Sequence, residues 1–226
     1  MSEIETETQL GWSREALAQR AAQDVPDGSY VNLGIGIPMM IPSRIPEGRE
    51  VWFHTENGIL GLGGVPDPDE VDLDVTNAGK EYATIVAGAS IFDSSLSFAI
   101  VRGGHLDIAV LGGMEATPSG DLANWTAPGR TPGVGGAMDL VSGAKQVWVV
   151  MDHTDRRGRS KLMRRCTLPH TGARCVDRIY TALGVFRPAG SHFDCLELAP
   201  GVSEDVVREL TDAEVAFDLA PVEESA

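Results

Sequence analysis

Short apolar runs, several of which end at glycine, are the feature that most limits how this chain can fold. They occur at 29–38, 50–55, 82–88, 98–104, 106–113 and 146–152. Several are apolar at successive positions, which is typical of strands covered on both faces. A helix is predicted over 13–25, where Ser13 can act as the N-cap. We therefore predict an α/β protein with an open, largely parallel mixed sheet and flanking helices.

The length of the chain fits one domain. With 226 residues, of which 42% are hydrophobic, the chain can bury one sizeable core. We expect a single domain over 13–218, between an acidic, disordered N-terminus at 1–12 and a disordered tail at 219–226. The glycine- and proline-rich segment 114–139 also holds many specific polar residues, so we predict a long functional loop there.

The formal charge of −15 is concentrated at the two ends of the chain. Residues 1–8 include three acids and no base, and residues 201–226 include eight acids against Arg208. No broad basic face is left to replace phosphate counterions, which excludes a nucleic-acid-binding protein. The one basic stretch, 156–165, is interpreted as a solvated hairpin, with phosphate contact as the alternative.

Cys166, Cys175 and Cys195 are odd in number and lack C-x-x-C spacing. This pattern argues against a disulfide framework and against a zinc site. The chain does not open with a signal-peptide pattern, and no apolar run approaches eighteen residues. We therefore expect a cytoplasmic protein without a membrane span.

The stretch HTENGILGLGG at 54–64 places a carboxylate where an apolar strand should end. Asn57 and Gly58 form a strong turn pair, so Glu56 is predicted at a sharp bend that projects its side chain toward a cleft. Partial loss of water there would make the carboxylate a better nucleophile or base. The alternative is a structural carboxylate that caps a helix or pairs with Lys80.

A glycine cluster at 133–136 is a second candidate. Gly133, Gly135 and Gly136 would let backbone N–H groups approach a ligand oxygen closely, as an oxyanion hole requires. An ordinary loop that leads into a helix explains the same spacing, and the spacing alone does not separate the two interpretations.

The segments VNLGIGIP and NAGKE contain the remaining candidates. Gly34 and Gly36 are followed by Met39, so the dinucleotide-binding pattern G-x-G-x-x-G fails. Asn32 could bind a substrate carboxylate or cap the loop. Lys80 could attract an anionic substrate or be a surface lysine. His54, two positions before Glu56, completes an H-x-E triplet like that of zinc deaminases, but the P-C-x-x-C partner is missing.

Six motifs follow one another along the chain: ENGILGLG, NAGKE, RGGHLDIAVLGG, GDLANW, VGGAMDL and CTLPHTG. Together they resemble the β subunit of the class I 3-oxoacid CoA-transferases over nearly the whole chain. The resemblance implies the CoA-transferase fold, a catalytic glutamate at Glu56, and an oxyanion hole at Gly136 with Ala137 beside it. We expect substrate-binding roles at Asn32, Gly34, Lys80 and Gly135.

The resemblance also implies the reaction. CoA would move from succinyl-CoA to a 3-oxo acid in a ping-pong mechanism through a glutamyl-CoA thioester, with CoA as a substrate and with no metal or organic cofactor. The stretch 151–162 is similar to 3-oxoadipate enzymes and 111–125 is also close to acetoacetate enzymes; we favour 3-oxoadipate as the acceptor. The alternatives are a sugar-phosphate isomerase or deaminase on a related sheet, and a non-catalytic CoA-binding subunit.

A β subunit of that family works with a separate α subunit. The resemblance therefore implies an α2β2 complex in which the α subunit completes the active site and covers apolar surface near the cleft.

Overall fold

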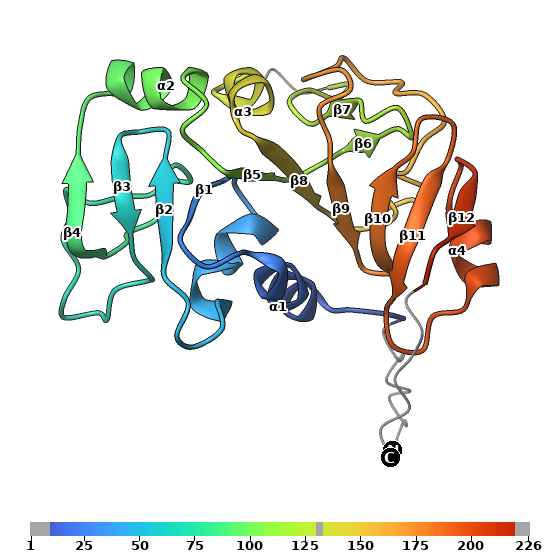
Figure 1. The fold of residues 1–226 in the computed structure, drawn as a ribbon, viewed down its shortest axis with the longest axis horizontal. Coiled ribbons are helices and arrows are strands. Elements are labelled where there is room, and N and C mark those ends of the chain that lie inside the picture. Colours follow the sequence, from blue (N-terminus) through green and yellow to red (C-terminus); the bar gives the residue numbers. More distant parts are fainter. Residues whose placement is uncertain (1–9, 130–132, 220–226) are drawn as a thin grey trace.

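The computed structural model describes residues 10–129 and 133–219. These residues form a ten-stranded sheet in the order β12-β11-β10-β9-β8-β5-β1-β2-β3-β4 (Figure 1). Five central neighbours are parallel, namely β1 (Ser29–Leu33), β2 (Val51–Thr55), β5 (Ile108–Leu111), β8 (Gln146–Val150) and β9 (Arg178–Thr181). The prediction of an open, largely parallel mixed sheet with flanking helices is confirmed.

The outer strands add antiparallel pairs on both sides of this centre. One side has β3 (Ile59–Leu62) and β4 (Ile85–Ile91). The other side has β10 (Gly184–Pro188) and β11 (Phe193–Leu198), followed by β12 (Val215–Phe217), which is parallel to β11.

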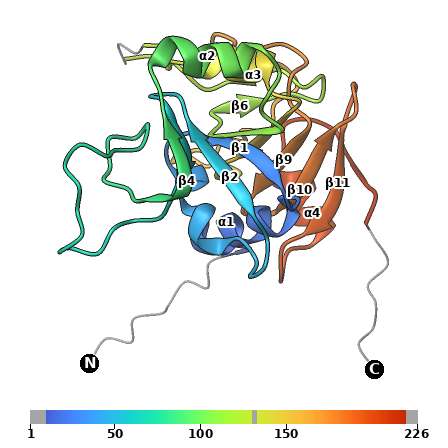
Figure 2. The same ribbon diagram turned by 60° about the vertical axis from the view of Figure 1, so that its left-hand side comes forward.

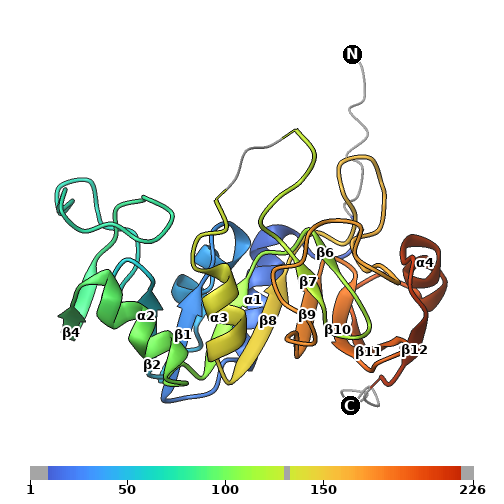
Figure 3. The ribbon, with the colours of Figure 1, turned by 90° about the horizontal axis from the view of Figure 1, so that it is seen from above.

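Helices cover both faces of the sheet. In Figure 2, α2 (Ser94–Arg102) and α3 (Ala137–Gly143) lie above it, and α1 (Arg14–Asp24) lies below. Seen from above in Figure 3, α3 lies between α2 and a hairpin of β6 (Glu115–Ala116) and β7 (Leu122–Ala123). The shorter elements are the 3-10 turns η1 (Ile37–Met40) and η2 (Pro42–Arg44), and α4 (Glu204–Leu210) beside β12.

Successive residues of the central strands β5, β8 and β9 belong to two separate cores. Ala109 and Leu111 of β5 pack in the core that contains buried residues of α2 and α3. Ile108 and Val110 of the same strand pack in the core that contains the buried face of α1. Because both faces of these strands are buried, their sequences are continuously apolar.

One predicted element is wrong. The run FAIVRGG at 98–104, predicted to be a strand, lies in α2 and the turn after it. Asp93 caps this helix by accepting a hydrogen bond from the N–H of Leu96 at 3.0 Å. The fully buried residues of α2, Ser97 and Val101, are four positions apart, as on one helix face. A short apolar run is compatible with either a helix or a strand. In this case the N-cap, Asp93, lies before the run and favours the helix.

The other predicted elements are present. The helix predicted over 13–25 is α1, and the Ser13 side chain accepts from the N–H of Ala16 at 3.2 Å, which confirms the N-cap. The segments 29–38, 50–55, 106–113 and 146–152 contain β1, β2, β5 and β8, and the strand expected over 82–88 overlaps β4. The segment 114–139 contains the β6–β7 hairpin.

The sequence predicts disorder over 1–12 and 219–226. Most of these residues, 1–9 and 220–226, lie outside the described ranges. Trp12, inside the predicted N-terminal segment, is described: its N–H donates to the carbonyl of Ala182 at 2.8 Å, and its side chain packs against both cores. Within 10–129 and 133–219, no helix has the length and apolar character needed to cross a bilayer.

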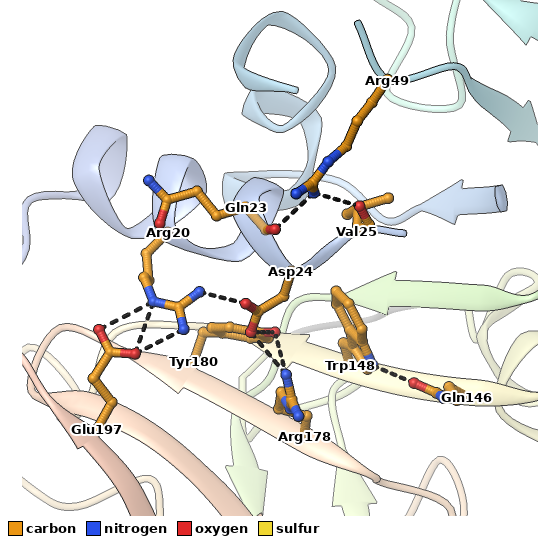
Figure 4. A network of polar contacts seen from close by, with 10 residues as sticks. All are labelled: Arg20, Gln23, Asp24, Val25, Arg49, Gln146, Trp148, Arg178, Tyr180 and Glu197. Carbon is orange, nitrogen blue, oxygen red and sulfur yellow. Dashed lines mark hydrogen bonds and ion pairs between the residues drawn. The ribbon is translucent and has the colours of Figure 1, made fainter. Parts of the chain in front are cut away.

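A polar network ties the end of α1 to the sheet on its lower face (Figure 4). The Asp24 carboxylate accepts from the buried Tyr180 hydroxyl at 2.8 Å and pairs with Arg178 at 2.7 Å. Arg20 contacts Asp24 at 2.7 Å and Glu197 of β11 at 2.7 Å. Burial acts to raise the pKa of Asp24, but the hydrogen bonds and the two guanidinium groups outweigh it and lower that pKa. The network therefore holds an ionised carboxylate between three elements.

We expect Asp24→Ala to lower the free energy of unfolding by about 3 kcal/mol, because two partly buried cations lose their shared partner. Asp205→Ala is the matched control, since the Asp205 side chain is 97% exposed; it should change stability by less than about 0.5 kcal/mol. Urea unfolding measures both. Equal effects of the two substitutions would contradict the role given to the network.

Candidate active site

A pocket of about 400 Å³ opens at the carboxyl ends of β1 and β5. The connection after β1 leads to β2, whereas the connection after the neighbouring strand β5 leads to β8 on the other side, so the two connections run in opposite directions along the sheet at this point. Such a switch in strand order leaves a crevice in which α/β proteins bind ligands. The lining includes the segments after β1 and β5, Asn124 and Trp125 after β7, and the glycine segment before α3.

Six of the seven residues predicted from the sequence line this pocket: Asn32, Gly34, Glu56, Gly135, Gly136 and Ala137. Lys80 does not. It is exposed and has a φ of 66°, while Ala78 of the same NAGKE segment does line the pocket. The structure therefore places Lys80 outside the lining of the pocket.

A tight turn after β2 fixes the position of Glu56. The carbonyl of Thr55 accepts from the N–H of Gly58 at 3.0 Å, and the side chain of Asn57 donates to the carbonyl of Thr76 at 2.8 Å. Gly58 has a φ of 107°, and a Cβ there would overlap the carbonyl oxygen of Phe92. Only glycine fits this position, so the predicted Asn-Gly turn has a direct structural reason.

The carboxylate of Glu56 lies against the backbone of Gly136. The N–H of Gly136 donates to this carboxylate. A Cβ added at Gly136 would overlap Oε2 of Glu56, whereas a Cβ at Gly135 would lie 4.0 Å from Oε1. The two segments singled out from the sequence therefore meet in one contact.

Glu56 is half-buried, and this burial changes the pKa of its carboxyl group. Burial raises the pKa of Glu56, the hydrogen bond from Gly136 lowers it, and the negative charge of Asp139 raises it, with a net increase. Asp139 itself pairs with Arg102 of α2 at 2.7 Å. A carboxylate held in this way is less solvated than a surface carboxylate and is therefore a stronger nucleophile.

Behind Glu56 is a chain of buried polar side chains that the sequence analysis did not predict. Nδ2 of Asn32 lies 3.0 Å from Nδ1 of His54, and Nε2 of His54 lies 3.1 Å from Oγ of Ser97. Asn32 and His54 are register partners on the parallel strands β1 and β2. The sequence does contain one signal for this pair, namely a polar residue inside each of two apolar runs. Since buried polar residues need hydrogen-bond partners, two such residues could have been expected to pair with each other.

The three cysteines are free thiols in the structure. Burial raises the pKa of Cys166 and of Cys195 to about 12, and that of Cys175 to about 11, so these thiols are protonated at neutral pH. No group of three or more His, Cys, Asp or Glu side chains within the described ranges could hold a metal ion.

Comparisons with known proteins agree with this geometry. A profile of the family described as coenzyme A transferase matches residues 14–210. The B-type subunit of the succinyl-CoA:3-ketoacid coenzyme A transferase of Helicobacter pylori (strain J99) is 49% identical over 207 residues, which cover 91% of this chain and 100% of the relative. The B-type subunit of the 3-oxoadipate CoA-transferase of Acinetobacter baylyi is 47% identical over 203 residues, which cover 89% of this chain and 94% of the relative.

A solved structure shares the fold. An acyl-CoA transferase from Escherichia coli O157:H7 superposes with a TM-score of 0.70 at 22% identity. The match covers 93% of this chain and 42% of that chain, so this chain spans less than half the length of that protein.

We expect Gly136→Ala to lower the free energy of unfolding by roughly 2 kcal/mol, because the new Cβ would overlap the Glu56 carboxylate and approach Phe98 at 2.9 Å. The φ of −85° at Gly136 suits alanine, so backbone strain does not contribute. A double-mutant cycle with Glu56→Ala, measured by urea unfolding, should give a clear coupling energy. A coupling energy near zero would argue against the contact.

Proposed function

Because the chain belongs to the coenzyme A transferase family, we propose that it is the β subunit of an enzyme that moves CoA from succinyl-CoA to a 3-oxo acid through a thioester on Glu56. The observation that supports this most directly is the contact between Glu56 and Gly136. It joins a poorly solvated carboxylate and a backbone donor, which are the two groups that acyl transfer through a carboxylate needs.

The proposed reaction begins when an oxygen of Glu56 attacks the thioester carbonyl of succinyl-CoA. The C–S bond breaks, CoA leaves as a thiolate, and an anhydride of Glu56 and succinate remains. The thiolate then attacks the glutamyl carbonyl of that anhydride, and succinate leaves as a carboxylate. A glutamyl-CoA thioester remains, and the carboxylate of the 3-oxo acid reverses the two steps. No net proton transfer is required.

The proposed role of Gly136 follows from the second step. When the thiolate attacks the glutamyl carbonyl, negative charge develops on an oxygen of the Glu56 side chain itself. The N–H of Gly136 already donates to this carboxylate in the resting state. A donor aimed at an oxyanion typically contributes roughly 3 to 4 kcal/mol to the transition state. Ala137 lines the same pocket and is proposed as the second donor.

The surroundings of the pocket support a partner subunit. Ile35, which lines the pocket, is 70% exposed, and Leu96 of α2 and Met138 of α3 are 49% and 39% exposed. Apolar side chains left open beside a binding pocket mark a surface that another protein can cover. Both relatives named above are called one subunit of an enzyme rather than the whole of it. We propose an α subunit on this surface, in an α2β2 complex.

We propose 3-oxoadipate as the acceptor, with acetoacetate as the alternative. The 3-oxoadipate molecule has a second carboxylate that acetoacetate lacks. The ammonium of Lys161 donates to the carbonyl of Gly113, a residue of the pocket wall, at 3.3 Å. Lys161 is part of the basic stretch 156–165, and burial lowers its pKa. Lys161 is not itself part of the lining of this pocket; it lines a neighbouring pocket that shares Met114 with it. It supports the choice of a dicarboxylate because it places a poorly solvated cation next to the pocket wall.

Glu56→Gln is the direct test of the reaction. The complex of this chain with its partner is exposed to acetoacetyl-CoA and quenched rapidly, and its peptides are analysed by mass spectrometry. We expect a CoA-sized adduct on the peptide that contains Glu56, discharged by succinate and absent in Glu56→Gln. Unchanged turnover in Glu56→Gln would instead favour a non-catalytic CoA-binding subunit.

Lys161→Met tests the acceptor. The variant keeps the aliphatic stem but removes the charge, so we expect kcat/KM for 3-oxoadipate to fall roughly 10- to 100-fold. The value for acetoacetate should change by less than about twofold, because acetoacetate has no distal carboxylate to lose a partner. Lys145→Met is the control, since Lys145 is 60% exposed and pairs with Asp107 away from this pocket. Equal losses for both acceptors would contradict the assignment.

A further inference from the structure

Three buried polar side chains connect β1, β2 and α2 directly behind Glu56. Asn32 is 1% exposed, and His54 and Ser97 are completely buried. The chain runs from Asn32 through both ring nitrogens of His54 to Ser97, whose Oγ lies 3.3 Å from the carbonyl oxygen of Thr55. Thr55 is the residue before Glu56, so the chain ends at the turn that bears the candidate nucleophile.

The direction of every hydrogen bond in this chain can be deduced. Nδ2 of Asn32 lies 3.1 Å from the carbonyl oxygen of His54, which can only accept, so this atom is the amide nitrogen. The same NH2 group lies 3.0 Å from Nδ1 of His54, so Nδ1 accepts. The proton of the neutral ring is therefore on Nε2 and is donated to Ser97, whose hydroxyl donates to the carbonyl of Thr55.

The direction of these hydrogen bonds excludes a catalytic triad and leaves an acceptor atom of Asn32 facing the pocket. A serine nucleophile needs a histidine nitrogen that accepts its proton, whereas Nε2 of His54 donates to Ser97. The Ser97–His54–Asn32 chain is therefore not a catalytic triad. At its other end, both N–H groups of Asn32 are used by His54, and none of the described residues donates to Oδ1 of Asn32. Asn32 lines the pocket, so it presents an acceptor there.

We propose that His54 is a positioning residue for the transferase reaction, acting on both sides of the pocket. It turns the Asn32 amide so that Oδ1 faces the ligand, and through Ser97 it fixes the carbonyl that precedes Glu56. An acceptor at Asn32 selects an N–H donor, such as an amide of the pantetheine arm of CoA, and disfavours a substrate carboxylate. The inference rests on the proposed function, since it concerns how Glu56 and CoA are held.

The kinetic test compares two histidines of this chain. The complex with the partner subunit is mixed with acetoacetyl-CoA, and the rate of adduct formation on Glu56 is followed by rapid quenching. His54→Phe keeps a ring but removes both hydrogen bonds, and we expect adduct formation to slow by about 100-fold because the reacting groups lose alignment. His54→Gln can accept from Asn32 and donate to Ser97, so we expect it to stay within about fivefold of the natural chain.

His153→Phe is the matched control. His153 is 3% exposed and bonds Thr181 and Thr211 through its two ring nitrogens at 2.9 and 3.0 Å, but it does not line the pocket. This variant should lose stability with little change in the adduct rate while folded. A rate in His54→Phe equal to that of the natural chain, or slowed no more than in His153→Phe, overturns the inference.

Neutron diffraction of the natural complex tests the direction of the chain without a variant. We expect the deuterium of the His54 ring on Nε2 and the Asn32 amide nitrogen toward His54. A deuterium on Nδ1 overturns the inference even where the variants fail to fold. Failure of the proposed function has a different signature, because then no adduct forms on Glu56 in the natural chain.

Discussion

The contact between the Glu56 carboxylate and the backbone N–H of Gly136 is the interaction on which the rest of the site depends. It joins two segments that are 80 positions apart in the sequence and that lie on different sides of the switch in strand order. Burial makes this carboxylate costly to ionise, and the single backbone donor offsets only part of that cost. The surrounding structure must therefore hold both segments in place, and the turn at Gly58 and the start of α3 do so.

The sheet supplies that rigidity because its central strands are buried on both faces. β5 divides its residues between two cores, whereas the apolar residues of β1 and β2 pack in one of them and Asn32 and His54 of these strands are buried as well. The carboxyl ends of the three strands therefore cannot shift without disturbing close packing. Asn32 and His54 occupy neighbouring positions at two of these ends, where an apolar pair would satisfy packing equally well. A polar pair fixes the orientation of its two side chains as well as their contact, because each hydrogen bond has a defined donor and a defined acceptor. This is a physical reason for placing a polar chain behind the proposed nucleophile.

Features that depend on residues close together in the sequence could be predicted from it, whereas features that depend on contacts between distant segments could not. The strands β1, β2, β5 and β8 were predictable because their apolar runs leave a local signal. The position of Glu56 at a sharp turn was predictable because Asn57 and Gly58 follow it directly. The helix α2 was missed because its apolar run fits either structure. The proposed role of His54 depends on its register with Asn32 and on Ser97 from another element, which no local pattern encodes. The family resemblance pointed to Lys80, which is exposed and is not among the residues that line the pocket, so its substrate-binding role stays a prediction.

The two faces of the sheet use buried charge in opposite ways. The pKa of Glu56 is higher in the folded chain than its ordinary value, so the folded state holds that proton more tightly, and this contribution to stability is lost as the pH rises from about 4.5 upward. The ionised form of Glu56, which is the form that the proposed reaction uses, is thus the less stable form of the fold. Asp24 has a lowered pKa, so its contribution is present above its ordinary value and is lost only in acid. At neutral pH the network around Asp24 therefore stabilises the scaffold under the conditions in which ionised Glu56 destabilises the site.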